Sequence, residues 1–297
     1  MCAPLVFVVI LGGVARAESG VHNAGGHGVA QSEDRVTGRA SRVFEAAGRI
    51  AAPSDHAAAP SGDRKSGGNQ GHGSGWAYSG DSGPAHWGGL KPEFKACADG
   101  TMQSPIDVRS SFSTPLPSIA FDYGIVPLTI LNNGHTVQVN VAKGSGITVG
   151  GKRYELLQFH FHTPSEHVVN ARHFPLEMHL VHKSAEGHLA VVGVFMQAGS
   201  ANIAMQEIWD HLPGSKAGPK TIAKVAINPR DLLPSDRRYY RYMGSLTTPP
   251  CSEGVNWYVM QQPVDVSIAQ IQAVANIMGQ NARPAQKRAN RLVMTGK

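Results

Sequence analysis

The sequence has little charge, few cysteines and no long hydrophobic run. Charged residues make up 16% of the 297 residues while glycine reaches 34, a composition unlike a helical bundle and typical of a loop-rich β protein. No segment approaches about eighteen consecutive apolar residues, so we expect no membrane span. The net charge is +6, and the one dense basic run (283–297) has no aromatic stacking platform and no binding motif, so we expect no nucleic-acid partner.

The first 72 residues do not have the composition of a folded domain. An apolar stretch from Leu5 to Val14 is followed by Ala-Arg-Ala before Glu18, so residues 1–17 resemble a secretory signal peptide, without the usual positive start. Residues 18–72 are rich in Gly, Ala, Ser and His without apolar periodicity, which predicts a disordered spacer. We therefore expect an exported protein, periplasmic or secreted, with its folded domain over residues 73–297.

The chain has three cysteines, so it can form at most one internal disulfide. Cys2 would leave with the signal peptide, and Cys97 and Cys251 would remain. Two thiols in an oxidising compartment are expected to pair, the alternative being two unrelated buried thiols. A bridge closing so long a loop would stabilise the fold by roughly 4–5 kcal/mol on the loop-entropy account.

Short apolar runs separated by Asn-Gly, Gly-Gly and Glu-Gly turns follow one another from Trp76 onward. Their lengths and compositions predict β-strands. Helical spacing occurs twice, over 200–212 with Ser200 as the N-cap and over 267–280. The pattern predicts one β-rich domain with few helices.

The run QFHFH (158–162) places two histidines one residue apart in a predicted strand. Side chains at i and i+2 share a face, so His160 and His162 project together with Gln158, about 6–7 Å apart along the strand. The two phenylalanines then face the core together with Leu157. Such a pair also occurs where both rings simply have ordinary hydrogen-bond partners.

A second strand, 177–182, supplies a further histidine. His179 shares its face with Glu177, whereas His182 points to the other side. If the two strands pair, three neutral imidazoles leave one tetrahedral position open, which is the arrangement of a catalytic zinc site. Metal-bound imidazole usually needs its other nitrogen engaged, and the same-face Glu177 and Gln158 are placed to do so. The pattern thus favours a metal site, and His167 is compatible with either role.

Several motifs occur in the order and approximate spacing of the α-class carbonic anhydrases: GPAHWGGL (83–90), QSPID (103–107), NNGH (132–135), QFHFH, SEH (165–167), EMHLVH (177–182), SLTTPPC (245–251) and NARPAQ (281–286). Over about residues 75–292 the chain resembles an exported, bacterial-type member. The resemblance implies a single mainly-β domain on a large, twisted, mostly antiparallel mixed sheet of about ten strands with a few short peripheral helices.

The resemblance implies a Zn²⁺ ion held by His160 and His162 through Nε2 and by His179 through Nδ1. Gln158 and Glu177 would orient the first and third of these rings. Zinc lowers the pKa of its bound water, so hydroxide is available to attack CO2 near neutral pH.

The same resemblance assigns the remaining site residues. Thr247 would accept a hydrogen bond from zinc-hydroxide and donate one to Glu166, and Thr248 would touch bicarbonate. His135 would carry protons to solvent, since a free imidazole titrates near neutrality. The resemblance implies that the wall facing CO2 consists of Val181, Val191, Leu246, Val255 and Trp257. It implies that the proton path is lined by Tyr78, Asn133 and Gln138. It also implies a disulfide between Cys97 and Cys251. The family also has cis peptides at Pro105 and Pro250.

The expected function is reversible hydration of CO2 to bicarbonate and a proton, with weak ester hydrolysis as a side activity and with CO2, bicarbonate and water as the only partners. Monomer and dimer are both compatible with the sequence. A catalytically inactive, carbonic-anhydrase-like binding module is disfavoured because all three metal histidines, Glu166 and Thr247 are present. A zinc hydrolase on an unrelated β-barrel is disfavoured by SLTTPPC and SEH.

Overall fold

The computed structural model describes residues 75–109 and 112–296. The expected signal peptide (1–17), with Cys2, and the expected spacer (18–72) lie outside these residues. No helix in the described ranges is long and apolar enough to cross a membrane.

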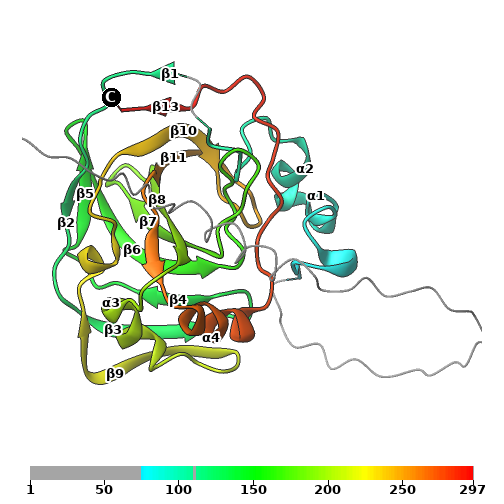
Figure 1. Ribbon diagram of the computed structural model, residues 1–297. Helices are drawn as coiled ribbons and strands as arrows, with labels where there is room; N and C mark the ends of the chain where they lie inside the picture. Colours follow the sequence, from blue (N-terminus) through cyan, green and yellow to red (C-terminus); the bar gives the residue numbers. More distant parts are fainter. Residues whose placement is uncertain (1–74, 110–111, 297) are drawn as a thin grey trace, which may run out of the picture. The chain divides into compact units, whose positions relative to one another are not determined.

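One large sheet dominates the described chain (Figure 1). Its strands are β1 (Phe112–Ser113), β2 (Ala120–Asp122), β3 (Val126–Asn132), β4 (Val137–Asn140), β5 (Gly146–Val149), β6 (Lys152–His162), β7 (Leu176–Lys183), β8 (Leu189–Ala198), β9 (Ala217–Ile227), β10 (Tyr239–Ser245), β11 (Glu253–Met260), β12 (Val264–Val266) and β13 (Met294–Thr295). The helices are α1 (Trp87–Leu90), α2 (Ala96–Asp99), α3 (Ile203–Trp209) and α4 (Ile268–Met278), with short 3-10 turns η1 (Gly80–Ser82), η2 (Pro92–Phe94) and η3 (Pro229–Leu232).

The strands follow the order β1-β13-β10-β11-β8-β7-β6-β4-β3-β9, with β2, β5 and β12 attached beside this path. Most neighbours are antiparallel, but β11 pairs with β8 in parallel. Ten strands thus lie along the main path and helices are few and short, as in the expected architecture, which is confirmed.

Apolar side chains cover both faces of the central strands. On β8, Val192 and Val194 join the larger core cluster, whereas the alternate residues Val191 and Phe195 join a second cluster around Trp257. Strand alternation produces this division, because successive side chains point to opposite faces. His160 and His162 of β6 and His179 of β7 lie on the face of the second cluster, so the site is built against an apolar wall.

A bulge in β6 changes which residues of this strand are buried. The register with β7 shifts between Leu156 and Gln158. Leu156 is therefore buried in the core, whereas Leu157, expected there, is 44% exposed. A bulge inserts one unpaired residue, which reverses the alternation on its upstream side. Downstream of it, the two phenylalanines are buried in the larger core cluster as expected.

Both predicted helices exist, with shorter bounds. The first begins after Asn202, whose side chain accepts a hydrogen bond from the Met205 amide, so Ser200 is not its N-cap. The second has Ser267 as its N-cap in a capping box with Gln270. The two helices contact each other, since the Trp209 indole donates to the Gln270 carbonyl over 2.7 Å. The predicted helical spacing was therefore correct but extended too far at the ends.

Candidate metal and catalytic site

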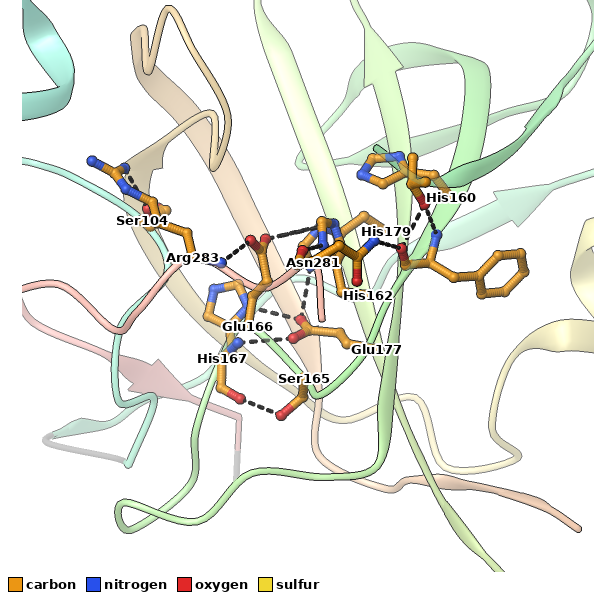
Figure 2. Close-up of polar contacts among 12 residues, drawn as sticks. Ser104, His160, His162, Ser165, Glu166, His167, Glu177, His179, Asn281 and Arg283 are labelled. Atoms are coloured by element: carbon orange, nitrogen blue, oxygen red, sulfur yellow. Dashed lines mark hydrogen bonds and ion pairs between the residues drawn. The ribbon is translucent and has the colours of Figure 1, made fainter. Parts of the chain in front are cut away.

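The pairing of β6 with β7 brings three histidines together. His160 lies directly opposite His179, and His162 lies opposite Glu177. The ring centroids are 5.0 Å apart for His160 and His162, 5.4 Å for His160 and His179, and 4.6 Å for His162 and His179. One nitrogen of each ring lies within 4.8 Å of the others. Figure 2 shows the three rings converging from the two strands.

Each imidazole has its other nitrogen engaged by an acceptor. His160 Nδ1 lies 2.9 Å from Gln158 Oε1, His162 Nδ1 lies 2.8 Å from the Asn281 carbonyl oxygen, and His179 Nε2 lies 2.9 Å from Glu177 Oε1. A carbonyl or carboxylate oxygen only accepts, so these nitrogens carry the protons. The lone pairs that remain are Nε2, Nε2 and Nδ1, and these are the nitrogens implied by the resemblance.

Glu177 is buried and lies at the centre of a second layer of hydrogen bonds. Besides His179, it accepts from the His167 backbone amide over 2.8 Å and from His167 Nδ1 over 2.7 Å. His167 Nε2 in turn lies 2.7 Å from the Tyr242 hydroxyl, which lies 2.8 Å from Ser104 Oγ. This chain of contacts uses His167 as a support of Glu177. The proximity of His167, Glu177 and His179 is thereby explained without a second metal ion.

Burial and neighbouring charges set the protonation of these groups. Burial lowers the pKa of His160 well below its usual value, and the nearby His162 lowers it further. Burial alone would raise the pKa of Glu177, but His167 and His179 bring it well below its usual value. Glu177 is therefore an ionised acceptor, and two neutral imidazoles face the centre of the site.

Two buried polar atoms at this centre have no hydrogen-bond partner: His162 Nε2 and Glu166 Oε2. An unpartnered buried acceptor is costly, so such atoms mark a place for a further group. Three imidazole lone pairs within mutual reach match the nitrogen donors that zinc prefers. The donor set at the site therefore fits a zinc ion.

Glu166 and Thr247 are both buried, and Glu166 lies near the histidines, but the two are not hydrogen-bonded to each other. Glu166 Oε1 accepts from the Arg283 backbone amide over 2.8 Å, and Oε2 lies 3.5 Å from His162 Nε2. The expected hydrogen bond from the Thr247 hydroxyl to Glu166 is absent among the described residues, since Oε2 has no donor. Thr248 closes the turn that follows, its carbonyl accepting from the Cys251 amide over 2.8 Å.

The expected apolar wall residues belong to one cluster. Trp257 is buried, and its ring lies 4.9 Å from that of His179. Its indole donates to the Ser245 carbonyl over 3.0 Å, which fixes the strand end that precedes Leu246 and Thr247. The other members of the expected wall, all in the second apolar cluster, are Val181, Val191, Leu246 and Val255.

His135 lies on a turn between β3 and β4, stacked on Trp76 at a centroid distance of 3.9 Å and an angle of 10°. Tyr78 approaches it edge-on at 6.3 Å. Asn133 Oδ1 accepts from the amides of His135 and Thr136 and so shapes the turn. Burial lowers the pKa of His135 below its usual value, and Lys216 lowers it further.

Gln138, the remaining residue of the expected proton path, lies on β4 directly opposite His160. Its amide donates to Asn140 Oδ1 over 2.7 Å. The register therefore places Gln138 in the same row across the sheet as two of the candidate metal ligands.

A disulfide joins Cys97 of α2 to Cys251, as predicted. Cys251 follows the turn that carries Thr247 and Thr248. The peptide bonds before Pro105 and Pro250 are cis, as the resemblance implied, and so is the bond before Pro164.

The segment 281–283 supports the site from far along the chain. Asn281 orients His162 through its carbonyl, and its side-chain amide donates to the carbonyls of His135 and Phe161 over 3.0 and 2.9 Å. The Arg283 guanidinium donates to the Cys97 and Ser104 carbonyls. NARPAQ was recognised as a motif, but nothing in its composition or periodicity indicates a partner for His162, because the contact is made by a backbone atom.

Comparisons with known proteins agree with this geometry. Residues 82–297 match the profile of the eukaryotic-type carbonic anhydrase family. The chain is 44% identical over 224 residues to a carbonic anhydrase of Nostoc sp., covering 74% of this chain and 85% of that protein. A carbonic anhydrase of Klebsiella pneumoniae is 41% identical over 223 residues, covering 74% of this chain and 90% of that protein.

Solved structures show the same likeness. An α-carbonic anhydrase from Thermovibrio ammonificans, solved with the inhibitor sulfanilamide, matches with a TM-score of 0.72 and 43% identity over 74% of this chain and 98% of its own. Dioscorin complexed with ascorbate matches with a TM-score of 0.69 and 34% identity over 74% of this chain and 97% of its own.

Proposed function

Because the chain belongs to the eukaryotic-type (α-class) carbonic anhydrases and is thus a carbonic anhydrase, we propose that it hydrates CO2 with a zinc ion held by His160, His162 and His179. The observation that carries this proposal is the convergence of three imidazole nitrogens whose opposite nitrogens are all engaged. Such pre-orientation raises metal affinity, because the tautomers and ring planes are set before binding.

A zinc ion in this position acts as a Lewis acid and supplies a hydroxide nucleophile near neutral pH. The chain's own contribution is to hold the donors, and burial lowers the pKa of His160 and of His162, which favours their neutral rings. Gln158 and Glu177 accept hydrogen bonds from the ring N–H groups of His160 and His179 that face away from the centre. The ionised Glu177 also offsets part of the positive charge that the buried site acquires.

Orientation of the nucleophile is assigned to Thr247 and Glu166. Glu166 Oε2 is buried and lacks a donor, while Oε1 is fixed by the Arg283 amide. A carboxylate held in this way has one oxygen that can accept from the Thr247 hydroxyl, whose own oxygen would then accept from the nucleophile. Thr248, next in the chain, contacts bicarbonate.

CO2 is apolar and is recognised by an apolar wall rather than by a charged anchor. Trp257 and the aliphatic residues of the second apolar cluster, Val181, Val191, Leu246 and Val255, supply this wall beside His179. A neutral substrate loses little hydration on entering such a surface. Weak ester hydrolysis follows as a side activity, since it needs the same nucleophile.

Proton release is assigned to His135, with Tyr78, Asn133 and Gln138 beside the water path. The half-buried imidazole lies on a turn between two strands rather than within the sheet, and its lowered pKa favours giving the proton up. Export is supported by the disulfide, because such bonds persist in oxidising compartments. The 1–17 signal and the 73–297 catalytic domain remain part of this proposal.

Replacing His179 with Ala tests the metal site. We expect stoichiometric zinc, measured by elemental analysis, and CO2 hydration, measured by stopped flow, to be lost together. His188→Ala is the matched control, because His188 is exposed in the turn after the same strand. Retained zinc and activity in the His179 variant would refute the ligand assignment.

Replacing His135 with Ala tests the proton path separately. Turnover in weak buffer should fall and should recover when imidazole is added, because free imidazole replaces the missing carrier. The ratio kcat/KM should hardly change, since it reports the hydration step. If turnover is the same with and without imidazole in both proteins, the shuttle lies elsewhere.

A further inference from the structure

A pocket of about 440 Å³ opens beside His135, and its lining includes Trp76, Asn133 and Lys216. The pocket combines an aromatic face, a carboxamide, an imidazole and an ammonium group. Trp76 covers one face of the imidazole by stacking on it. The pocket is therefore adjacent to the group from which protons leave the enzyme.

The Lys216 side chain packs against Gly134 at the edge of this pocket. Its aliphatic part runs across Gly134, where a Cβ would lie 3.2 Å from Lys216 Cδ and 3.6 Å from Cε. Gly134 has φ +90°, a conformation that favours glycine, so the chain leaves room for the lysine to cross. The packing brings a positive charge close to His135.

The ammonium of Lys216 has no carboxylate partner within the part of the chain that the structure describes, although other surface lysines such as Lys95 and Lys152 do. An uncompensated charge beside the imidazole repels cations and attracts anions. Burial lowers the pKa of His135, and the positive charge of Lys216 close to the ring lowers it further.

We propose that this pocket binds a small oxyanion, such as hydrogen phosphate, through Lys216, and that the bound oxyanion accepts the proton from His135. This proposal rests on the proposed shuttle role of His135. In the step, the imidazolium N–H bond breaks and an O–H bond forms on the anion. Imidazolium and hydrogen phosphate become neutral imidazole and dihydrogen phosphate, which leaves as a weaker ligand for the lysine because it carries less charge.

The kinetic test compares two proton acceptors of similar pKa and different charge. Turnover at saturating CO2 is measured by stopped flow against the concentration of inorganic phosphate and, separately, of imidazole. In Lys216→Gln the half-saturating phosphate concentration should rise about two- to fivefold, the range for an exposed ion pair. Charge reversal in Lys216→Glu should raise it further, and Lys216→Arg should preserve it. The half-saturating imidazole concentration should not rise in any of these variants.

Lys220→Gln is the matched control. Lys220 is also exposed and lies in β9, whereas Lys216 directly precedes that strand. The two lysines are four residues apart, which is about 13 Å of extended chain and beyond the Debye length of about 10 Å at 0.1 M ionic strength. The phosphate dependence of Lys220→Gln should match that of the wild type. Two results would overturn the proposal. One is an equal rise of the half-saturating phosphate and imidazole concentrations in Lys216→Gln. The other is the same rise for phosphate in Lys220→Gln.

Binding is measured independently of catalysis by titrating inorganic phosphate into ¹⁵N-labelled protein. Amide resonances of residues 133–135 and 216 should shift in the wild type and in Lys220→Gln, but not in Lys216→Gln. Shifts that persist in the Lys216 variant would overturn the oxyanion site. If phosphate binds as expected but His135→Ala leaves turnover unchanged, the shuttle assignment has failed and the acceptor role of the anion falls with it.

Discussion

The disulfide between Cys97 and Cys251 should contribute a large part of the stability of this domain. It joins positions 154 residues apart, so it restricts a very long loop in the unfolded chain. On the loop-entropy account, a closed loop of that length corresponds to about 5 kcal/mol at 25 °C. Both cysteines are buried beside Trp87 and Phe94, so the folded state gains no compensating freedom when the bond is removed.

The double variant Cys97→Ala/Cys251→Ala measures this contribution by urea unfolding. With a slope of about 3 kcal/mol per molar urea, the midpoint should fall by about 1.7 M. The wild type in the presence of a reductant should behave like the double variant. In the full-length chain, Cys2→Ala is the control, and it should leave the midpoint unchanged because the bond joins Cys97 to Cys251.

A midpoint shift below about 0.3 M would refute the entropic reasoning, since it corresponds to less than 1 kcal/mol at this slope. Activity gives a second readout. The bond lies four residues after Thr247, so the double variant should lose turnover at temperatures where the fold itself persists. Unchanged activity under those conditions would show that the turn of Thr247 and Thr248 is held by its own hydrogen bonds.

Two further predictions concern buried side chains of β7, Glu177 and His182. A Cβ at Gly193 would lie 2.9 Å from Glu177 Oε1, so Gly193→Ala should displace this carboxylate. Zinc affinity, measured by chelator competition, should then weaken about 10- to 100-fold. Gly218→Ala is the control and should leave zinc affinity unchanged, because a Cβ there meets nothing within 4 Å. Equal zinc affinity in both variants would contradict the role given to Glu177. The second prediction concerns His182, because burial lowers its pKa from 6.5 to about 3 and the folded state therefore favours the neutral ring. The stability that this group contributes above pH 6.5 should be lost as the pH falls from 6.5 towards 3. At pH 5 the loss from this group should be about 2 kcal/mol relative to pH 7, and urea unfolding of His182→Gln should show a pH dependence smaller by that amount; an identical pH dependence would argue against it.

Much of the site could be predicted from local periodicity. Alternation along β6 placed His160 and His162 on one face, and alternation along β7 placed Glu177 with His179 and His182 apart from them. These predictions succeed because the side-chain period of a strand is fixed by backbone geometry. The bulge at Leu157 could not be predicted in the same way, because it depends on the register with β7, which the sequence of β6 alone does not contain.

Other features depend on contacts between distant segments. β9 was not predicted, since ten of its eleven residues are not fully buried and it pairs only with β3 at the edge of the sheet. The start of α3 was predicted two residues too early, because Ser200 and Asn202 are both good N-caps. Asn202 is selected by its contact with Gln270 of α4. The support of His162 by Asn281 was missed because a carbonyl oxygen is present at every residue.

The segment 281–283 also determines when the site can form during synthesis. The Asn281 carbonyl that orients His162 is made 119 residues after the histidine itself, and the amide that fixes Glu166 is made 117 residues after the carboxylate. At a synthesis rate of about 5–20 residues per second, this separation corresponds to a delay of about 6–24 s. A nascent chain therefore holds all three imidazoles well before the carbonyl that sets the tautomer of His162 and the amide that fixes Glu166. Loading of the metal is accordingly expected to follow completion of the polypeptide rather than to guide the early steps of its folding.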